Sequence, residues 1–166
     1  MLERQHFIFV ANDISMIANR KISAIDIKDT LLKHGFWSFS ETAPLRAKLR
    51  EGDRALIYLA GPGRRMFVAV ATIATDAMEL VSGSEEKKIL SGLGIGFLKY
   101  KVQLKDVVNF PNNIKITHLI DKLNFIIEKK NYGLHLRLPI VRINSTDFEL
   151  VLKNGFDEVR HELIDR

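Results

Sequence analysis

The sequence contains no cysteine and a single tryptophan, Trp37, among its 166 residues. Without cysteine there is no disulfide, no thiolate nucleophile and no cysteine-ligated zinc. No apolar run reaches the length of a membrane-spanning helix, and the N-terminus lacks the basic and then apolar segments of a signal peptide. We therefore expect an intracellular, cytoplasmic protein with no membrane contact.

Motifs of catalysis are also missing. The sequence has no G-x-S-x-G, no Walker loop and no H-E-x-x-H. The glycines of Gly92-x-Gly94-x-Gly96 have neither the spacing nor the preceding strand of a dinucleotide-binding turn. The five histidines are scattered along the chain, and no local pair has ligand spacing. We predict no catalytic residue, no metal site and no cofactor.

The composition that remains is that of a globular domain with a basic surface. At 166 residues and 46% hydrophobic content, the chain is long enough for one domain, residues 1–166, with a substantial core. The net charge is +5 and the pI is about 9.5, which favours a polyanionic partner such as nucleic acid. The excess is greatest between Lys33 and Arg65, where seven basic residues face only Glu41, Glu51 and Asp53.

Short apolar runs between turn residues predict about six strands. The clearest pair, Arg54–Leu59 and Met66–Ala74, forms a hairpin across Gly61-Pro62-Gly63, and its near-continuous hydrophobicity predicts strands covered on both faces. The other predicted strands are His6–Ala11, Phe36–Phe39, Phe97–Leu104 and Ile140–Ile143.

Helical spacing and capping residues predict helices between these strands. Three glycines at positions 92, 94 and 96 predict a flexible joint before residue 97. The long crossovers of a doubly wound parallel sheet are missing, so we predict an α+β fold, a small mixed β-barrel with peripheral helices. The predicted helices are Ile22–Lys33, Thr42–Gly52, one starting at Ser84, Ile116–Ile127, one from Ser145 to Gly155, and Asp157–Arg166.

Several segments together resemble a known family. They are the opening HFIFVANDIS, Gly35-Phe36-Trp37-Ser38, the segment LRAKLREGD, the two strands after it and LPIVRINSTD near the end. In their order and spacing, these pieces resemble the EVE and YTH branches of the PUA-like superfamily. The resemblance implies a PUA-like barrel that binds nucleic acid and holds one flipped, modified base in an aromatic pocket.

The resemblance also implies roles for particular residues. Trp37 would stack on the base, the backbone near Ser38 would contact its edge, and Asn12 and Asp13 would lie at the mouth of the pocket. Stacking of a base on an aromatic ring contributes roughly 1–3 kcal/mol. A second aromatic wall would come from one of four residues, of which we favour the one after the glycine joint: Phe97, ahead of Phe39, Tyr58 and Tyr100.

Each of these residues also has an ordinary structural interpretation. Trp37 is either a core residue or a pocket wall, and Asn12 and Asp13 are common turn residues. The basic residues are either solvated surface charges or phosphate contacts, namely Arg64 and Arg65 at a hairpin tip and Arg46, Lys48 and Arg50 on a predicted helix. Tyr132-Gly133 and His135-Leu136-Arg137, in the loop before the last strand, either flank the groove or are plain loop residues.

The main functional hypothesis is a non-catalytic reader of a methylated adenine or cytosine, with DNA favoured over RNA. Within the family, such domains occur at the N-terminus of modification-dependent restriction proteins of the McrB type. This chain is compatible with such a place, and any nuclease or motor would then lie in another domain or subunit. The alternatives are an RNA-binding PUA-like module acting on tRNA, rRNA or a methylated transcript, a small-molecule or protein-interaction domain that uses the same pocket, and, last, an enzyme.

Overall fold

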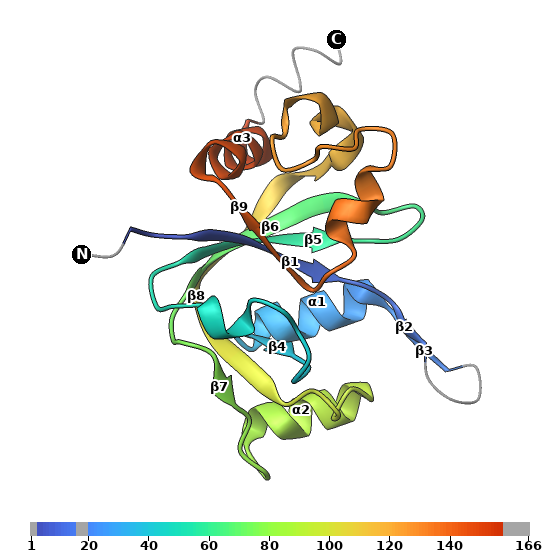
Figure 1. Cartoon of the computed structure of the whole chain (residues 1–166). Helices are drawn as coiled ribbons and strands as arrows, with labels where there is room; N and C mark the ends of the chain where they lie inside the picture. The colour runs from blue at the N-terminus through green and yellow to red at the C-terminus, as the bar shows by residue number, and fades with distance from the viewer. Residues whose placement is uncertain (1–2, 16–19, 158–166) are drawn as a thin grey trace.

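A mixed β-sheet that curls into a half-barrel forms the centre of the molecule (Figure 1). The computed structural model describes residues 3–15 and 20–157. Within them the strands are β1 (His6–Ala11), β2 (Ile14–Ser15), β3 (Lys21–Ile22), β4 (Phe36–Phe39), β5 (Arg54–Leu59), β6 (Met66–Ile73), β7 (Met78–Glu79), β8 (Tyr100–Lys115) and β9 (Ile140–Ile143). The helices are α1 (Ala24–Lys33), α2 (Glu85–Leu93) and α3 (Ser145–Phe156). The α+β class predicted above is confirmed.

The strand order of the main sheet is β4-β8-β6-β5-β1-β9, and β7 pairs with β8 beside this path. β1 runs parallel to β5, and the other pairs in the sheet are antiparallel. The short strands β2 and β3 form a separate ribbon that projects from the end of β1 (Figure 1). Because β4 and β9 end the path, the barrel stays open between them.

Two apolar cores lie on opposite faces of the sheet. Alternate residues of β1 enter different cores: Phe7 and Phe9 point to the side covered by α1, whereas Ile8 and Val10 point to the side covered by α3. The residues of β5 alternate in the same way. A strand that is buried on both faces needs apolar side chains at every position. This confirms the interpretation of the continuous hydrophobic runs in the β5–β6 hairpin.

The segment Thr42–Gly52 is not the helix that we predicted. It contains only a 3-10 turn, η2 (Arg46–Lys48), and Leu45 before it adopts a left-handed conformation with φ of 68°. The buried Asp53 carboxylate accepts hydrogen bonds from the backbone amides of Gln5 and Arg50. These bonds tie the turn to the start of β1 instead of continuing a helix.

The segment Ile116–Ile127 is also not a helix. It forms two 3-10 turns, η3 (Ile116–His118) and η4 (Ile120–Lys122), followed by an irregular stretch. The fully buried carboxylate of Asp147 accepts the amides of Asn124 and Phe125 at 2.8 and 2.9 Å. A side chain from α3 therefore takes the place of helical hydrogen bonds here.

The remaining differences concern the ends of elements. The strand predicted over Phe97–Leu104 runs instead from Tyr100 to Lys115, and Gly94 ends α2 in the left-handed conformation, with φ of 92°. α1 begins two residues later than predicted, after a cap by Ser23. Asn144, not Ser145, caps α3, and Gly155 lies inside that helix. The helix predicted over Asp157–Arg166 lies, beyond residue 157, outside the described residues.

Candidate nucleic-acid interface

A pocket of about 320 Å³ lies where the free edge of β4 faces the end of β1. Its deep wall is apolar, with Ile27 and Leu31 from α1 and Ile95 from the segment after α2. Four of the six predicted pocket residues line it: Asn12, Trp37, Ser38 and Phe97. The fold thus brings together residues from three segments that are far apart in the sequence.

Trp37 is both a core residue and a wall of this pocket. Its side chain is only 3% exposed, and its ring lies nearly parallel to that of Phe9, with a centroid separation of 6.0 Å. Phe9 in turn contacts Phe39 edge to face. The two interpretations of the tryptophan are therefore compatible, because the ring has Phe9 behind it and also lines the pocket.

Ser38 presents its backbone, not its hydroxyl, to the open edge of the sheet. The hydroxyl donates a hydrogen bond to the carbonyl oxygen of Tyr100 at 2.8 Å. The amide of Leu104 donates to the carbonyl of Gly35. In an antiparallel pair of strands, hydrogen-bonded residue pairs alternate with pairs that are not bonded, so the next bonded pair is Trp37 with Val102. The amide and carbonyl of Ser38 consequently point to the other side of β4, where the strand path ends.

Asn12 and Asp13 differ in role although they are adjacent. Asn12 is exposed and lines the pocket. The carboxylate of Asp13 accepts the amide of Ala24 at 2.8 Å and forms ion pairs with Lys21 at 3.0 Å and Arg64 at 2.9 Å. The hydrogen bond from the Ala24 amide, together with these two cations, lowers the pKa of Asp13 to about 2. Asp13 holds the loop together beside the pocket and does not line it.

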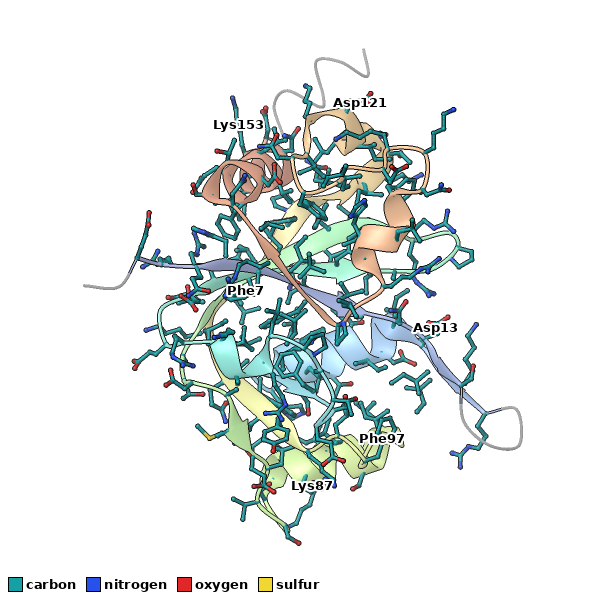
Figure 2. All side chains as sticks on the ribbon, in the orientation of Figure 1. Phe7, Asp13, Lys87, Phe97, Asp121 and Lys153 are labelled. Atoms are coloured by element: carbon teal, nitrogen blue, oxygen red, sulfur yellow. The ribbon has the colours of Figure 1, made fainter. Side chains whose placement is uncertain are left out.

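Phe97 stands at the mouth of the pocket with 52% of its surface exposed. The segment that carries it is fixed by Lys87 of α2, whose ammonium donates to the carbonyl oxygens of Gly96 and Leu98 at 2.7 and 2.9 Å. Figure 2 shows Phe97 on the same side of the molecule as Asp13, with Lys87 at the α2 end of the structure. Phe39 also lines the pocket, whereas Tyr58 and Tyr100 do not.

A second hollow of about 290 Å³ adjoins the first. Tyr58, predicted to be a pocket residue, lies here together with Arg65, Tyr132 and Arg137. Asn12 and Arg137 line both hollows, so the two are adjacent. Tyr58 is 2% exposed, and burial raises the pKa of its hydroxyl well above the usual value.

The five basic residues predicted to contact phosphate do not form one surface. Only Arg65 among them lines a hollow beside the pocket, and Arg64 is held by Asp13 and by the carbonyl oxygen of Ala60. Arg46 stacks on Tyr100 with its guanidinium carbon 3.8 Å from the ring centroid and also donates to the carbonyl of Glu41. Lys48 and Arg50 are exposed, and Arg50 lines a different depression beside Asp53.

Sequence reasoning missed part of the lining. Ile27, Leu31, Ile95, Leu98 and Pro139 line the pocket but were not predicted to do so. The apolar face of α1 was visible in the sequence, but nothing in that pattern distinguishes a residue under a pocket from one inside a core. Arg137, considered above only as a possible flank of the groove, lines both hollows.

The described residues contain neither a membrane-spanning helix nor a group of side chains that could bind a metal ion. None of the helices in residues 3–15 and 20–157 is long and apolar enough to cross a membrane. Over the same ranges, no three His, Asp or Glu side chains come together in a way that could hold a metal ion.

The curled half-barrel, with its pocket between β4 and β1, is a small PUA-like fold, as predicted. A family model described as the EVE domain matches residues 16–154. The chain therefore belongs to the EVE domain family. No curated protein matches it in sequence.

Solved structures with the same fold include domains that were determined with modified nucleic acids. Human THYN1 protein in complex with 5-methylcytosine-containing DNA has a TM-score of 0.61 at 13% identity, over 93% of this chain and 99% of that one. The YTH domain of Zygosaccharomyces rouxii MRB1, in complex with N6-methyladenosine RNA, has a TM-score of 0.56 at 14% identity, over 92% and 87%. The N-terminal domain of Staphylothermus marinus McrB has a TM-score of 0.52 at 13% identity, over 90% and 94%.

Proposed function

We propose that this EVE domain binds nucleic acid and holds one flipped, methylated base in the pocket between β4 and β1. The observation that carries the proposal is the combination in one pocket of an aromatic wall, Trp37, with an open backbone edge at Ser38. A base outside the stack needs a flat apolar partner and polar groups for its Watson–Crick edge, and this pocket offers both.

The open edge suits two bases in particular. The Ser38 amide is a donor and its carbonyl an acceptor, spaced as on any strand edge. Adenine and cytosine each present a ring-nitrogen acceptor beside an amino group that donates, so a backbone donor and acceptor match either one. An N6-methyl group on adenine leaves one amino proton free for the carbonyl, and a 5-methyl group on cytosine leaves its amino group intact.

The size and the lining of the pocket favour a methylated base. Its volume of about 320 Å³ is at the lower end of the range for ligand pockets, roughly 300–1,000 Å³. It therefore has room for about one base. Ile27, Leu31 and Ile95 make the interior apolar, and burying a methyl group there contributes up to about 0.8 kcal/mol. This term favours a methylated base over its unmodified counterpart.

The solved structures with this fold support a modified base and leave the sugar open. One of them holds methylated DNA and another holds methylated RNA. We place DNA ahead of RNA for this chain, in a binding role without chemistry of its own. Any nuclease or motor would then lie in another domain or subunit, and the fold shared with the N-terminal domain of McrB is in keeping with this arrangement.

The test is fluorescence anisotropy with matched oligonucleotides, unmodified, adenine-methylated and cytosine-methylated, each as DNA and RNA, at two salt concentrations. Tighter binding of one methylated oligonucleotide supports the proposal and names the base and the sugar. If all oligonucleotides bind with equal affinity and that affinity falls with salt, the domain binds nucleic acid without selecting a methylated base. No binding at either salt concentration would contradict the proposal and favour a small-molecule or protein partner.

The variant for this test is Trp37→Phe, with Phe9→Leu as the matched control. Both residues belong to the same aromatic contact, but only Trp37 lines the pocket. We expect Trp37→Phe to weaken the preference for the methylated base, and Phe9→Leu to preserve it despite a loss of stability. Loss of the preference in both variants would mean that binding depends on general stability rather than on the pocket wall.

A further inference from the structure

We infer that the second hollow, lined by Tyr58, Arg65 and Arg137, binds a phosphodiester group next to the base held in the first pocket. This inference rests on the proposed function, because it assigns the strand that carries the base to a specific place on the surface. It also separates the basic residues of this region into those that bind the ligand and those that hold the fold.

One wall of the hollow carries a tyrosine hydroxyl that has no hydrogen-bond partner among the described residues. Tyr58 is 2% exposed, and its hydroxyl takes part in no hydrogen bond within residues 3–15 and 20–157. Its ring packs against Phe67 at a centroid separation of 5.0 Å, which fixes the side chain beside the hollow. Because burial keeps the pKa of this hydroxyl high, it remains a hydrogen-bond donor at neutral pH.

Two arginines line the same hollow as Tyr58, and neither has an acidic partner among the described residues. Arg65 is exposed, and its guanidinium donates to the hydroxyl of Tyr132 at 3.5 Å. Arg137 is exposed as well. Neither forms an ion pair with a carboxylate among the described residues, and no Asp or Glu lines the hollow. Arginine forks match the oxygen geometry of phosphate, and hydrogen bonds between charged groups are about twice as strong as neutral ones.

Arg64, the residue before Arg65, differs from it because its guanidinium has partners within the protein. Arg64 is only 17% exposed at its side chain, donates to the carbonyl of Ala60 and pairs with Asp13. Its charge is neutralised by Asp13, whereas Arg65 pairs with no carboxylate in residues 3–15 and 20–157. Of the two arginines at the tip of the β5–β6 hairpin, Arg64 therefore serves the fold and Arg65 serves the ligand.

The hollow lies next to the pocket in which we propose that the base is held. Asn12 and Arg137 line both hollows, so a group in the second one lies directly beside a base in the first. In a nucleic acid, the group next to each base, beyond its sugar, is a phosphodiester. Figure 1 shows the β5–β6 turn and the segment before β9 on the same side of the sheet as the end of β1.

The experiment replaces single phosphodiesters, one at a time, by uncharged methylphosphonates around the methylated base of an oligonucleotide. Affinities are measured for the wild-type chain, the double variant Arg65→Gln/Arg137→Gln, Tyr58→Phe and Lys153→Gln. Tyr58→Phe keeps the ring against Phe67 and removes only the hydroxyl. Lys153→Gln removes one positive charge from α3, on another part of the surface (Figure 2).

We expect one linkage beside the methylated base to be sensitive in the wild-type chain, with an affinity loss of about tenfold on replacement. In the double variant, replacing this linkage changes the affinity by less than about twofold, because the contact is already lost. Tyr58→Phe should weaken binding and reduce the same sensitivity in part. Lys153→Gln should retain the wild-type pattern.

Two results overturn the inference in different ways. If the wild-type chain prefers the methylated oligonucleotide but the double variant shows the same sensitive linkage as the wild type, the phosphate lies elsewhere and base reading stands. If the wild-type chain binds no oligonucleotide, both the phosphodiester site and the proposed function fail.

Discussion

The guanidinium of Arg64 lies 2.9 Å from the carboxylate of Asp13, and this pair joins the β5–β6 turn to the loop after β1. Both side chains are largely shielded from solvent, with 17% and 18% of their surface exposed. The same carboxylate caps the start of α1 by accepting the Ala24 amide. Asp13 thus links three segments beside the pocket.

Asp13→Asn should destabilise the protein at neutral pH and have little effect in strong acid. The pKa of Asp13 in the folded protein, about 2, is below its ordinary value near 3.8, so the carboxylate favours folding only while it is ionised. This contribution is complete above about pH 4 and is lost as the pH falls through about 2. Urea unfolding of both proteins across this range should show the difference in free energy of unfolding shrinking with acidity.

The control for this prediction is Glu41→Gln. Glu41 pairs with Lys99 at 3.2 Å, but the two side chains are 58% and 54% exposed. Exposed pairs contribute little to stability. We expect almost no change from this variant at either end of the pH range. A stability loss in Asp13→Asn that is the same at neutral pH and in strong acid would show that the ion pair is not its cause.

The strands could be predicted because burial on two faces leaves a simple pattern. Continuous apolar runs at His6–Ala11, Arg54–Leu59 and Met66–Ile73 correspond to strands between two cores. The false helix at Ile116–Ile127 shows the limit of such patterns. Ile116, Leu119 and Leu123 are buried at helical spacing. The carboxylate of Asp147, distant in sequence, nevertheless accepts hydrogen bonds from the backbone amides of this segment.

The pocket could be predicted in part for a similar reason. Trp37, Ser38 and Asn12 belong to local segments with a family resemblance, and the fold brings them together with Phe97. The pairing of Asp13 with Arg64 and the placement of Tyr58 beside Arg65 and Arg137 depend on contacts between distant segments. A single sequence contains no signal for such contacts, so residue type alone could not show which of these side chains lie together.

Trp37→Ala should destabilise the fold, so it is a poor probe of the pocket. The side chain is 3% exposed and packs on Phe9, and replacing a buried aromatic residue by alanine costs about 3–5 kcal/mol. Trp37→Phe retains most of the apolar volume and should cost less. Thermal unfolding of the two variants beside the wild type measures the difference. A native-like melting temperature for Trp37→Ala would show that the ring contributes little to the core.

Lys87→Met should release the segment that carries Phe97. The ammonium of Lys87 donates to the carbonyls on both sides of this residue, and methionine has a similar length without the donors. Losing these hydrogen bonds should increase local opening by about tenfold. Chymotrypsin cleaves after exposed phenylalanines, so the rate of cleavage after Phe97 reports this opening. The affinity for the methylated oligonucleotide should fall in the same variant.

Two further variants separate this local effect from a general one. Lys87→Arg keeps the charge and the donors and should restore part of the protection. Lys88→Met changes the exposed neighbouring lysine and should leave cleavage unchanged. If Lys87→Met is cleaved after Phe97 no faster than Lys88→Met, then the two hydrogen bonds do not hold the pocket mouth.

Gly155→Ala should destabilise α3 although alanine favours helices. A Cβ atom at this position would lie 2.7–2.8 Å from three ring atoms of Phe110, which is closer than real contacts allow. Phe110 is itself buried and rests edge to face on Phe156, so its ring has little freedom to move. Overpacking of this kind costs about 1–3 kcal/mol, which exceeds the gain of up to about 1 kcal/mol from helix propensity.

The matched control is Gly92→Ala in α2, where a Cβ atom would meet nothing within 4 Å. There the propensity term acts alone, so this variant should be more stable than the wild type by about 0.5–1 kcal/mol. Urea unfolding of both variants should give changes of opposite sign. Adding Phe110→Leu to Gly155→Ala should recover part of the lost free energy of unfolding, because a smaller side chain relieves the clash. If nothing is recovered, the strain lies in the backbone of α3.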